Sequence, residues 1–201
     1  MKLRRALPAD APTLSDICVR TGHRGHDSRG VYGDPSLLAA MYLLPYLALE
    51  PDWCWVGEDD EDGRITPVGY IVGTPDTRTF AARAEARCWP ALRAQHPLPA
   101  QDDTSVQARL TRALHGGPPS GLPFLDSHPA HLHIDLLPPA QGQGHGSTLM
   151  ALFIEALRAA GVPGVHLGVS AQNPRAIAFY RHIGFETLQD AGWGLWMGRR
   201  C

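Results

Sequence analysis

The chain has 201 residues, of which 44% are hydrophobic and 19% charged, values typical of one compact globular domain rather than a disordered or fibrous protein. A formal net charge of −2 provides no general attraction to nucleic acid or to an anionic membrane, so binding must come from a specific site. No apolar run reaches the roughly 18 to 20 residues that span a bilayer, and the N-terminus lacks the apolar segment of a signal peptide. We therefore expect a cytoplasmic protein with no membrane partner.

The first part of the chain predicts helices around an antiparallel hairpin. Leu14, Ile17 and Cys18 fall at helical spacing, whereas the glycines of residues 22–35 indicate a loop. The acidic segment 59–63 predicts the turn of a hairpin. In chain order we expect a strand at 3–6, a helix at 11–20, a helix at 36–49 interrupted at Pro45, and strands at 53–58 and 68–73.

The second part predicts a helical insertion followed by alternating strands and helices. Residues 80–125, rich in Ala and Arg and broken by prolines, form the expected insertion. The run 131–137 alternates apolar residues with His131, His133 and Asp135, which predicts a strand with one polar face. We then expect a helix from about 146 to 160, a strand at 165–169, a helix that Asn173 caps and Gly184 ends, and short strands at 185–188 and 195–197.

A glycine-rich segment lies between the strand 131–137 and the helix that follows it. Glycines there let backbone N–H groups converge on an anion, and the helix dipole adds about half a positive charge. A dinucleotide fingerprint is excluded because Ser147 stands where its third glycine should be, and a Walker loop because no Gly-Lys-Ser/Thr occurs. A Gln-x-x-Gly-x-Gly phosphate cradle remains, with a tight turn that binds nothing as the alternative.

Together with the downstream segment 173–185, this loop closely resembles the GCN5-related N-acetyltransferases (GNAT). The resemblance implies a single domain over residues 1–201, with a mixed α/β sheet splayed between two parallel strands and helices on both faces. It implies acetyl-CoA as cofactor, with its pyrophosphate on the loop, its pantetheine arm along the preceding strand, and an Asn and a Tyr near the thioester. These cofactor-binding roles fall on Ile134, Asp135, Leu136, Gln141, Gly142, Gln143, Gly144, His145, Gly146, Ser147, Asn173 and Tyr180.

A narrower resemblance extends upstream of the two motifs. Segments 51–56 and 68–74, the pair Trp89-Pro90 and residues 131–133 look like the acetyltransferase-like domain at the C-terminus of O-GlcNAcase and its free-standing bacterial relatives. The animal version looks like a pseudo-acetyltransferase whose cofactor loop has decayed, whereas this chain keeps the loop glycines. We expect no glycosidase portion, because nothing upstream of the motifs is long enough to build one.

Acetyl transfer requires a base for the amine and an acid for the departing thiolate. The resemblance favours Tyr180 as the acid. Many relatives carry a glutamate five residues before the Asn, but Gly168 stands there, so the base must lie elsewhere. We rank His133 above Asp135, because an imidazole near its ordinary pKa of about 6.5 can take a proton near neutral pH. Structural hydrogen bonding is the alternative for His133 and Asp135, and His166 is a weaker third option for the base.

The remaining candidates concern metals, cysteines and the acceptor. His23 with His26, and His131 with His133, have no regularly spaced third ligand, so we expect no metal site. No cysteine lies in the two motifs, which favours direct transfer over an acyl-cysteine route. We expect a monomer or homodimer that acetylates a small-molecule or peptide amine; a non-catalytic acetyl-CoA-binding module is the alternative. We expect the acceptor to contact Asp27, Arg29 and Tyr32.

Overall fold

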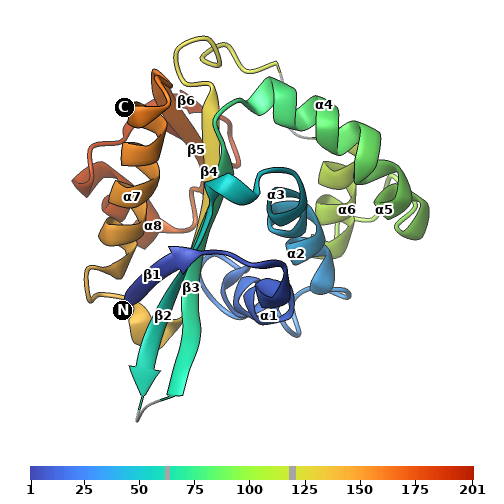
Figure 1. Ribbon diagram of the computed structural model, residues 1–201. Helices are drawn as coiled ribbons and strands as arrows, with labels where there is room; N and C mark the ends of the chain where they lie inside the picture. The colour runs from blue at the N-terminus through green and yellow to red at the C-terminus, as the bar shows by residue number, and fades with distance from the viewer. Residues whose placement is uncertain (62–63, 118–120) are drawn as a thin grey trace.

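The computed structural model describes residues 1–61, 64–117 and 121–201 and shows a seven-stranded sheet with helices on both faces (Figure 1). The spatial order is β1-β2-β3-β4-β5-β7-β6, with β4 and β5 parallel and the other neighbours antiparallel. The strands are β1 (Lys2–Arg5), β2 (Cys54–Glu61), β3 (Arg64–Thr74), β4 (Ala130–Leu136), β5 (Gly164–Ser170), β6 (Glu186–Asp190) and β7 (Gly194–Arg200). This arrangement confirms the mixed α/β sheet predicted from the sequence.

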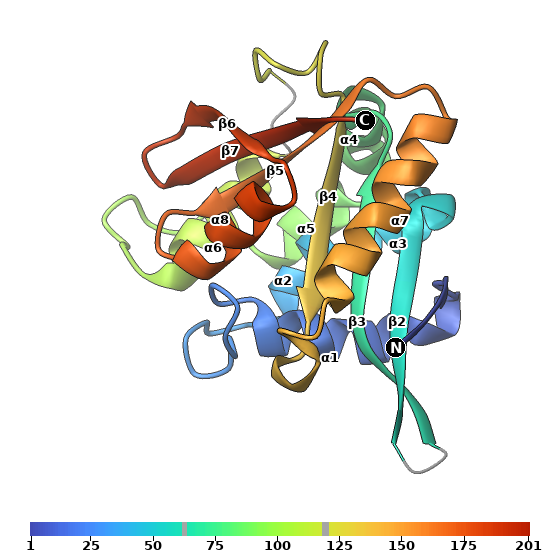
Figure 2. The same ribbon diagram turned by 90° about the vertical axis from the view of Figure 1, so that its left-hand side faces the viewer.

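Two hydrophobic clusters cover the two faces of the sheet. Helices α7 and α8 lie on one face and α1 to α6 on the other (Figures 1 and 2). Alternation along β3 divides its side chains, so that Tyr70 and Val72 join one cluster and Ile71 the other. The helices are α1 (Ala11–Thr21), α2 (Ser36–Tyr42), α3 (Leu44–Leu49), α4 (Thr77–Arg87), α5 (Trp89–Gln95), α6 (Val106–Gly116), α7 (His145–Ala159) and α8 (Pro174–His182).

The parallel pair β4 and β5 is joined only at one end. Ladder pairing is restricted to Ala130 with Val165 and His131 with His166, after which the two strands diverge (Figure 2). On its other side β4 stays paired with β3 from His131 to Leu136. The backbone groups of β4 that face β5 beyond His131 therefore have no ladder partner, and the sheet is open there.

The bounds of the helices differ from expectation at a capping residue and at a proline. The expected insertion at 80–125 forms α4, α5 and α6, and α4 begins earlier because Asp76 Oδ1 accepts a hydrogen bond from Thr79 N at 2.7 Å. The expected break at Pro45 divides 36–49 into α2 and α3 at Leu43. Pro45 has no N–H to continue the helical ladder, so the chain starts a new helix instead.

Parts of two expected loops lie outside the described residues. Residues 59–61 of the expected acidic turn belong instead to β2, which continues to Glu61, and residues 62–63 lie outside the description. Residues 118–120 of the insertion also lie outside it. Within the described ranges, no helix combines the length and apolarity needed to cross a membrane.

Candidate active site

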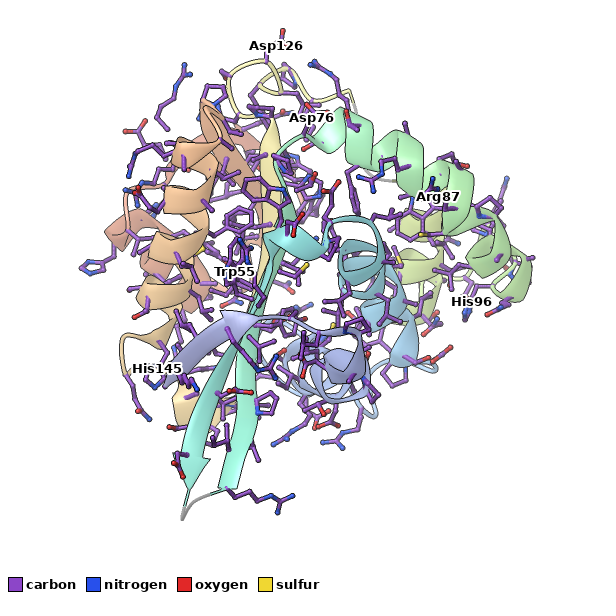
Figure 3. All side chains as sticks on the ribbon, viewed as in Figure 1. Trp55, Asp76, Arg87, His96, Asp126 and His145 are labelled. Atoms are coloured by element: carbon purple, nitrogen blue, oxygen red, sulfur yellow. The ribbon has the colours of Figure 1, made fainter. Side chains whose placement is uncertain are left out.

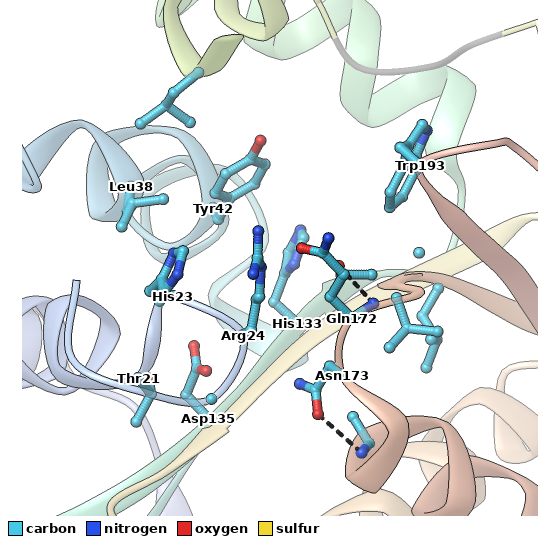
Figure 4. Close-up of a pocket in the computed structure, with 18 of the residues that line it drawn as sticks. Thr21, His23, Arg24, Leu38, Tyr42, His133, Asp135, Gln172, Asn173 and Trp193 are labelled. Carbon is cyan, nitrogen blue, oxygen red and sulfur yellow. Dashed lines mark hydrogen bonds between the residues drawn. The ribbon is translucent and has the colours of Figure 1, made fainter. Parts of the chain in front are cut away.

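A cleft of about 760 Å³ opens where β4 and β5 separate (Figure 4). Its lining includes His133 and Asp135 from β4, Asn173 from the β5–α8 connection and Tyr180 from α8. Arg24, from the connection between α1 and α2, extends into the same opening in Figure 4. The structure thus gathers the predicted acid, both leading base candidates and the predicted Asn in one place.

The glycine-rich loop carries several unpaired backbone donors near this cleft. Gly142 and Gly144 adopt φ values of 75° and 80°, and a Cβ at either position would meet no protein atom within 4 Å. The amides of residues 142–147 donate no hydrogen bond to any described residue. Several free N–H groups at the start of α7 make a site that fits a pyrophosphate.

The side chains of the loop hold its shape rather than point donors at a ligand. Gln141 Nε2 donates to Leu136 O at 2.7 Å, and Gln143 Nε2 donates to Pro139 O at 2.6 Å. His145 starts α7 at the end of the helix nearest β1 in Figure 3, and Ser147 follows in the same first turn. The predicted anion contacts of this loop are therefore backbone contacts.

The third glycine of the loop serves packing. A Cβ on Gly146 would lie 3.1 Å from Phe179 Cζ of α8, tighter than ordinary packing allows. The absence of a side chain lets the start of α7 approach α8, which carries Tyr180. The loop and the cleft are in this way joined through α8.

Asn173 and Tyr180 lie one after the other along the cleft side of α8. Asn173 Oδ1 accepts from Ala176 N at 3.1 Å and caps the helix, as its position before Pro174 predicts. The Tyr180 hydroxyl has no hydrogen-bond partner among the described residues. Burial, with a smaller contribution from the Asp135 charge, raises the pKa of Tyr180, so the phenol is protonated at neutral pH.

A chain of hydrogen bonds links the polar face of β4 to helices α3 and α4. Thr77 Oγ1 lies 2.6 Å from Pro129 O and 2.7 Å from His131 Nδ1. Tyr46 Oη lies 2.7 Å from His131 Nε2 and 3.2 Å from His133 Nε2. Two oxygens at 2.6 Å require a hydrogen between them, so Thr77 donates to the Pro129 carbonyl and accepts from His131 Nδ1.

The direction of donation along these hydrogen bonds determines the tautomer of His133. His131 has its proton on Nδ1, so its Nε2 accepts from the Tyr46 hydroxyl. The Tyr46 oxygen then accepts from His133 Nε2–H, which leaves the Nδ1 lone pair of His133 without a partner among the described residues. We therefore assign the Nε2–H tautomer to His133, with Nδ1 free to accept a proton.

Burial shifts the pKa of both base candidates on β4. It lowers the pKa of His133 to about 4, with a smaller effect of His166, so this imidazole is neutral at pH 7 and a weaker base than the ordinary value implies. Burial raises the pKa of Asp135, although the Tyr70 hydroxyl donates to Asp135 Oδ2 at 2.5 Å and opposes the shift. Asp135 already accepts this hydrogen bond, whereas His133 has a free lone pair.

His166, the third base candidate, lies deeper than the cleft. Its Nδ1 hydrogen-bonds to His128 O at 2.8 Å, the side chain is 1% exposed, and burial lowers its pKa to about 4. It lines a second cavity of about 780 Å³ that adjoins the cleft. That cavity shares His133 and Gly168 with the cleft.

The position of the missing glutamate is closed by two indole rings. A Cβ on Gly168 would lie 2.9 Å from Trp193 Cη2 and 3.0 Å from Trp196 Cζ3. A longer side chain would need both rings to move. The glycine at position 168 therefore goes together with these tryptophans. This pairing could not be predicted from the sequence, because it depends on the register of β5 with β7.

The predicted acceptor contacts do not all reach the cleft. Tyr32 lines it, whereas Asp27 and Arg29 are exposed and form an ion pair with each other at 2.5 Å. Arg24, which sequence reasoning missed, lines the cleft with φ 57°, a left-handed conformation uncommon for a residue with a side chain. The glycines around it indicated a loop but not its direction.

The described residues offer neither a reactive thiolate in the cleft nor a set of metal ligands. Cys18 lines the cleft, but burial raises the pKa of its thiol to about 12, so no thiolate is available there at neutral pH. Across the described ranges, no group of three His, Cys, Asp or Glu side chains is arranged to hold a metal ion. His23 and His26 instead face each other across a backbone bridge.

The sequence matches the acetyltransferase (GNAT) family over residues 26–185, and the chain therefore belongs to that family. This match confirms the family resemblance and places the chain among acetyltransferases. The fold is similar to the crystal structure of SsHAT, with 39% identity, a TM-score of 0.90 and coverage of 99% of this chain and 97% of that one.

Other relatives are more distant. The PaiA N-acetyltransferase of Thermoplasma acidophilum, solved in complex with coenzyme A, is 15% identical, with a TM-score of 0.60 and coverage of 100% of this chain and 98% of that chain. The O-GlcNAcases of Rattus norvegicus and Mus musculus are each 25% identical over 193 residues. The match covers 94% of this chain but 20% of either enzyme, so the chain spans about a fifth of their length. These findings support acetyl transfer, and none supports the non-catalytic alternative.

Proposed function

We propose that this protein transfers an acetyl group from acetyl-CoA to a primary amine by direct attack within a ternary complex. The observation that carries the proposal is the row of free amides at 142–147, next to a cleft that holds a protonated phenol and a free imidazole lone pair. Acetyl-CoA would supply an acetyl group already activated as a thioester. The chain's own residues bind it, orient the amine and move the protons.

Binding divides between two backbone surfaces. The amides of 142–147 hold the pyrophosphate at the positive end of α7. The unpaired edge of β4, at Ile134, Asp135 and Leu136, offers peptide groups to the amides of the pantetheine arm. Asn173, whose Oδ1 is committed to capping α8, keeps its Nδ2 group for the cofactor near the thioester.

His133 is the base. Its Nδ1 takes the proton that the amine loses as the amine nitrogen bonds to the acetyl carbonyl carbon. Thr77, His131 and Tyr46 are positioning residues, because their hydrogen bonds place the proton of His133 on Nε2 and leave Nδ1 open. Without that chain the two tautomers would compete, and one of them has no lone pair on Nδ1.

Tyr180 is the acid. Its raised pKa keeps the hydroxyl protonated in water at neutral pH. The leaving thiolate is a much stronger base than water and can accept this proton. Tyr180 gives its proton to the sulfur as the bond between sulfur and the acetyl carbon breaks. The proton later returns from solvent or from the base.

Two glycines at opposite ends of α7 make a matched test of the cofactor site. Gly144 and Gly161 have φ values of 80° and 71°, and a Cβ at either meets no protein atom within 4 Å. Gly144→Val and Gly161→Val therefore introduce similar backbone strain, but only the first places a side chain among the free amides. Calorimetry should show at least a tenfold loss of CoA affinity for Gly144→Val and less than a twofold change for Gly161→Val. Equal affinity in both variants would show that CoA binds elsewhere.

A further inference from the structure

The second cavity, which we call the aromatic cavity, has walls made mainly of aromatic rings. Six aromatic side chains line its volume of about 780 Å³, within the range of small-molecule sites. They come from α2, α3, α4, α5, β7 and the turn before β7: Tyr42, Tyr46, Phe80, Trp89, Trp193 and Trp196. Part of this wall is already ordered, since Tyr46 stacks on Phe80 with ring centroids 4.3 Å apart.

The aromatic cavity opens onto the proposed base. His133, Gly168, Tyr42 and Trp193 line both the aromatic cavity and the cleft. In Figure 4, Tyr42 and Trp193 face each other across the opening, with His133 between them. Because His133 lines both spaces, a flat molecule in the aromatic cavity can bring one end to this imidazole.

The charges of the region disfavour a cationic occupant. None of the described residues that line the aromatic cavity is Asp or Glu, and its charged side chain is Arg109. Arg24 adds a second cation in the adjoining cleft. The carboxylate that lines the cleft, Asp135, does not line the aromatic cavity. An ammonium ion in the aromatic cavity would therefore leave water for a space with a cation in its wall and no carboxylate among its described lining residues, which is costly.

Resting on the proposed function, we propose that the acceptor is an aromatic amine that is uncharged at neutral pH, with its ring in the aromatic cavity and its NH₂ group at His133. Such a nitrogen reaches the site with its lone pair free, so the base has to remove a proton only as the new bond forms. This matches the low pKa of His133, which suits it to an acidic N–H in the transition state rather than to a stable ammonium. The products are the N-aryl acetamide and CoA, with the amine proton passing to His133 and the Tyr180 proton to the sulfur.

Two isomers test the charge requirement without changing size. p-Toluidine and benzylamine have the same atoms, but the first is mainly uncharged at pH 7 and the second is protonated. Calorimetry with the CoA-saturated protein should give at least tenfold tighter binding of p-toluidine, and p-toluidine should release CoA from acetyl-CoA. Tighter binding or faster acetylation of benzylamine, or of a lysine peptide, would overturn the aromatic-amine assignment.

A filled cavity tests the location. Gly116 lines the aromatic cavity from the end of α6 and does not line the cleft, whereas Gly121 is exposed and lies outside the cavities described here. A Cβ at either glycine would meet no protein atom within 4 Å. Gly116→Phe should weaken p-toluidine binding at least tenfold, whereas Gly121→Phe should change it less than twofold; both should keep CoA affinity within twofold. Thermal unfolding identifies a variant that has lost its fold, in which case Gly116→Leu replaces it.

The outcomes separate this proposal from the proposed function. Normal acetyl-CoA binding with no acetylation of p-toluidine overturns the aromatic-amine class alone. Absence of acetyl-CoA binding overturns the proposed function itself. Equal p-toluidine affinity in Gly116→Phe and in the unaltered protein would place the amine outside the aromatic cavity.

Discussion

The two sides of the cleft are built in opposite ways. The cofactor side consists of the loop 141–147 and the start of α8, where a short stretch of sequence determines glycine conformations, a helix start and a cap. The acceptor side consists of β4 side chains held by Tyr46, Thr77 and Tyr70. These three residues lie 54 to 87 positions along the chain from the β4 residues that they contact. The cofactor side is thus built from residues that are close together in the sequence. The acceptor side is built from residues that only the tertiary structure brings together.

This difference separates binding from chemistry. The cofactor side offers backbone groups, which any residue with a suitable conformation can provide, and its specificity comes from geometry. The acceptor side offers a defined tautomer of His133, a raised pKa of the Tyr180 phenol and a cavity whose described lining includes no carboxylate, and each of these depends on burial. Variants on the acceptor side should therefore alter turnover while leaving cofactor affinity intact.

The largest effect is expected at Tyr180. Tyr180→Phe keeps the ring against α7 and removes the proton that the leaving thiolate needs. Loss of a general acid lowers the rate by about 10² to 10⁴, so kcat with an acceptor amine should fall by that factor. Acetyl-CoA affinity by calorimetry should change less than twofold. An unchanged kcat would remove Tyr180 from the mechanism.

The second effect is expected at His133, with a fall of about 10² in kcat for His133→Gln. In the unaltered protein the rate should fall below about pH 5, because protonation at a pKa of about 4 removes the Nδ1 lone pair. This places the acidic limb below the pH 6 to 7 that an ordinary imidazole would give. The limb should disappear in His133→Gln and persist in Asp135→Asn.

Stability at low pH provides the control for that profile. His131 and His133 both have a pKa lowered by burial, so the unfolded chain binds more protons than the folded one between about pH 4 and 6.5. The free energy of unfolding should accordingly decrease as the pH falls through this range. Thermal unfolding at each pH shows whether a lower rate comes from loss of the base or loss of the fold. Survival of the limb in folded His133→Gln would place the base elsewhere.

What the sequence could predict follows the same division. The order of strands and helices, the αL glycines of the loop and the Asn173 cap were accessible because each depends on neighbours in the chain. The shared face of His133 and Asp135 was also accessible, since side chains alternate along a strand. The pKa of His133 was not, because its depression comes from burial under helices of the insertion and of the N-terminal segment.

Other features were inaccessible for the same physical reason. The rings that fill the space beside Gly168 arrive through the pairing of β5 with β7 and the turn before β7. The direction of Arg24 depends on a left-handed conformation that no glycine signalled at that position. The exposed pair Asp27 and Arg29 had the chemistry of a substrate contact but turns outward to form its own ion pair.

A smaller effect is expected from the positioning chain. Tyr46→Phe removes the acceptor of the His133 Nε2 proton and the donor to His131 Nε2, so the two tautomers of His133 should both become populated. We expect a fall in kcat of about tenfold with KM for acetyl-CoA unchanged, since only part of the population keeps a free Nδ1. The ¹⁵N chemical shifts of the imidazole report the tautomer directly. A single unchanged tautomer in Tyr46→Phe would mean that the chain of hydrogen bonds does not determine it.

The smallest effect is expected where the acceptor side meets β7. Gly168→Ala adds a Cβ at 2.9 to 3.0 Å from two indole rings, and overpacking of this kind costs about 1 kcal/mol or more where the neighbours cannot move. Trp193 is 54% exposed and can yield, so the loss in free energy of unfolding should stay near the low end of that range. A double-mutant cycle identifies the cause, because in a Trp193→Ala background the cost of Gly168→Ala should shrink if ring contact is responsible. Chemical denaturation of the four proteins measures this coupling. An equal cost in both backgrounds would assign the penalty to Trp196 or to the strand itself, and the space left by Gly168 would then be independent of the turn that carries Trp193.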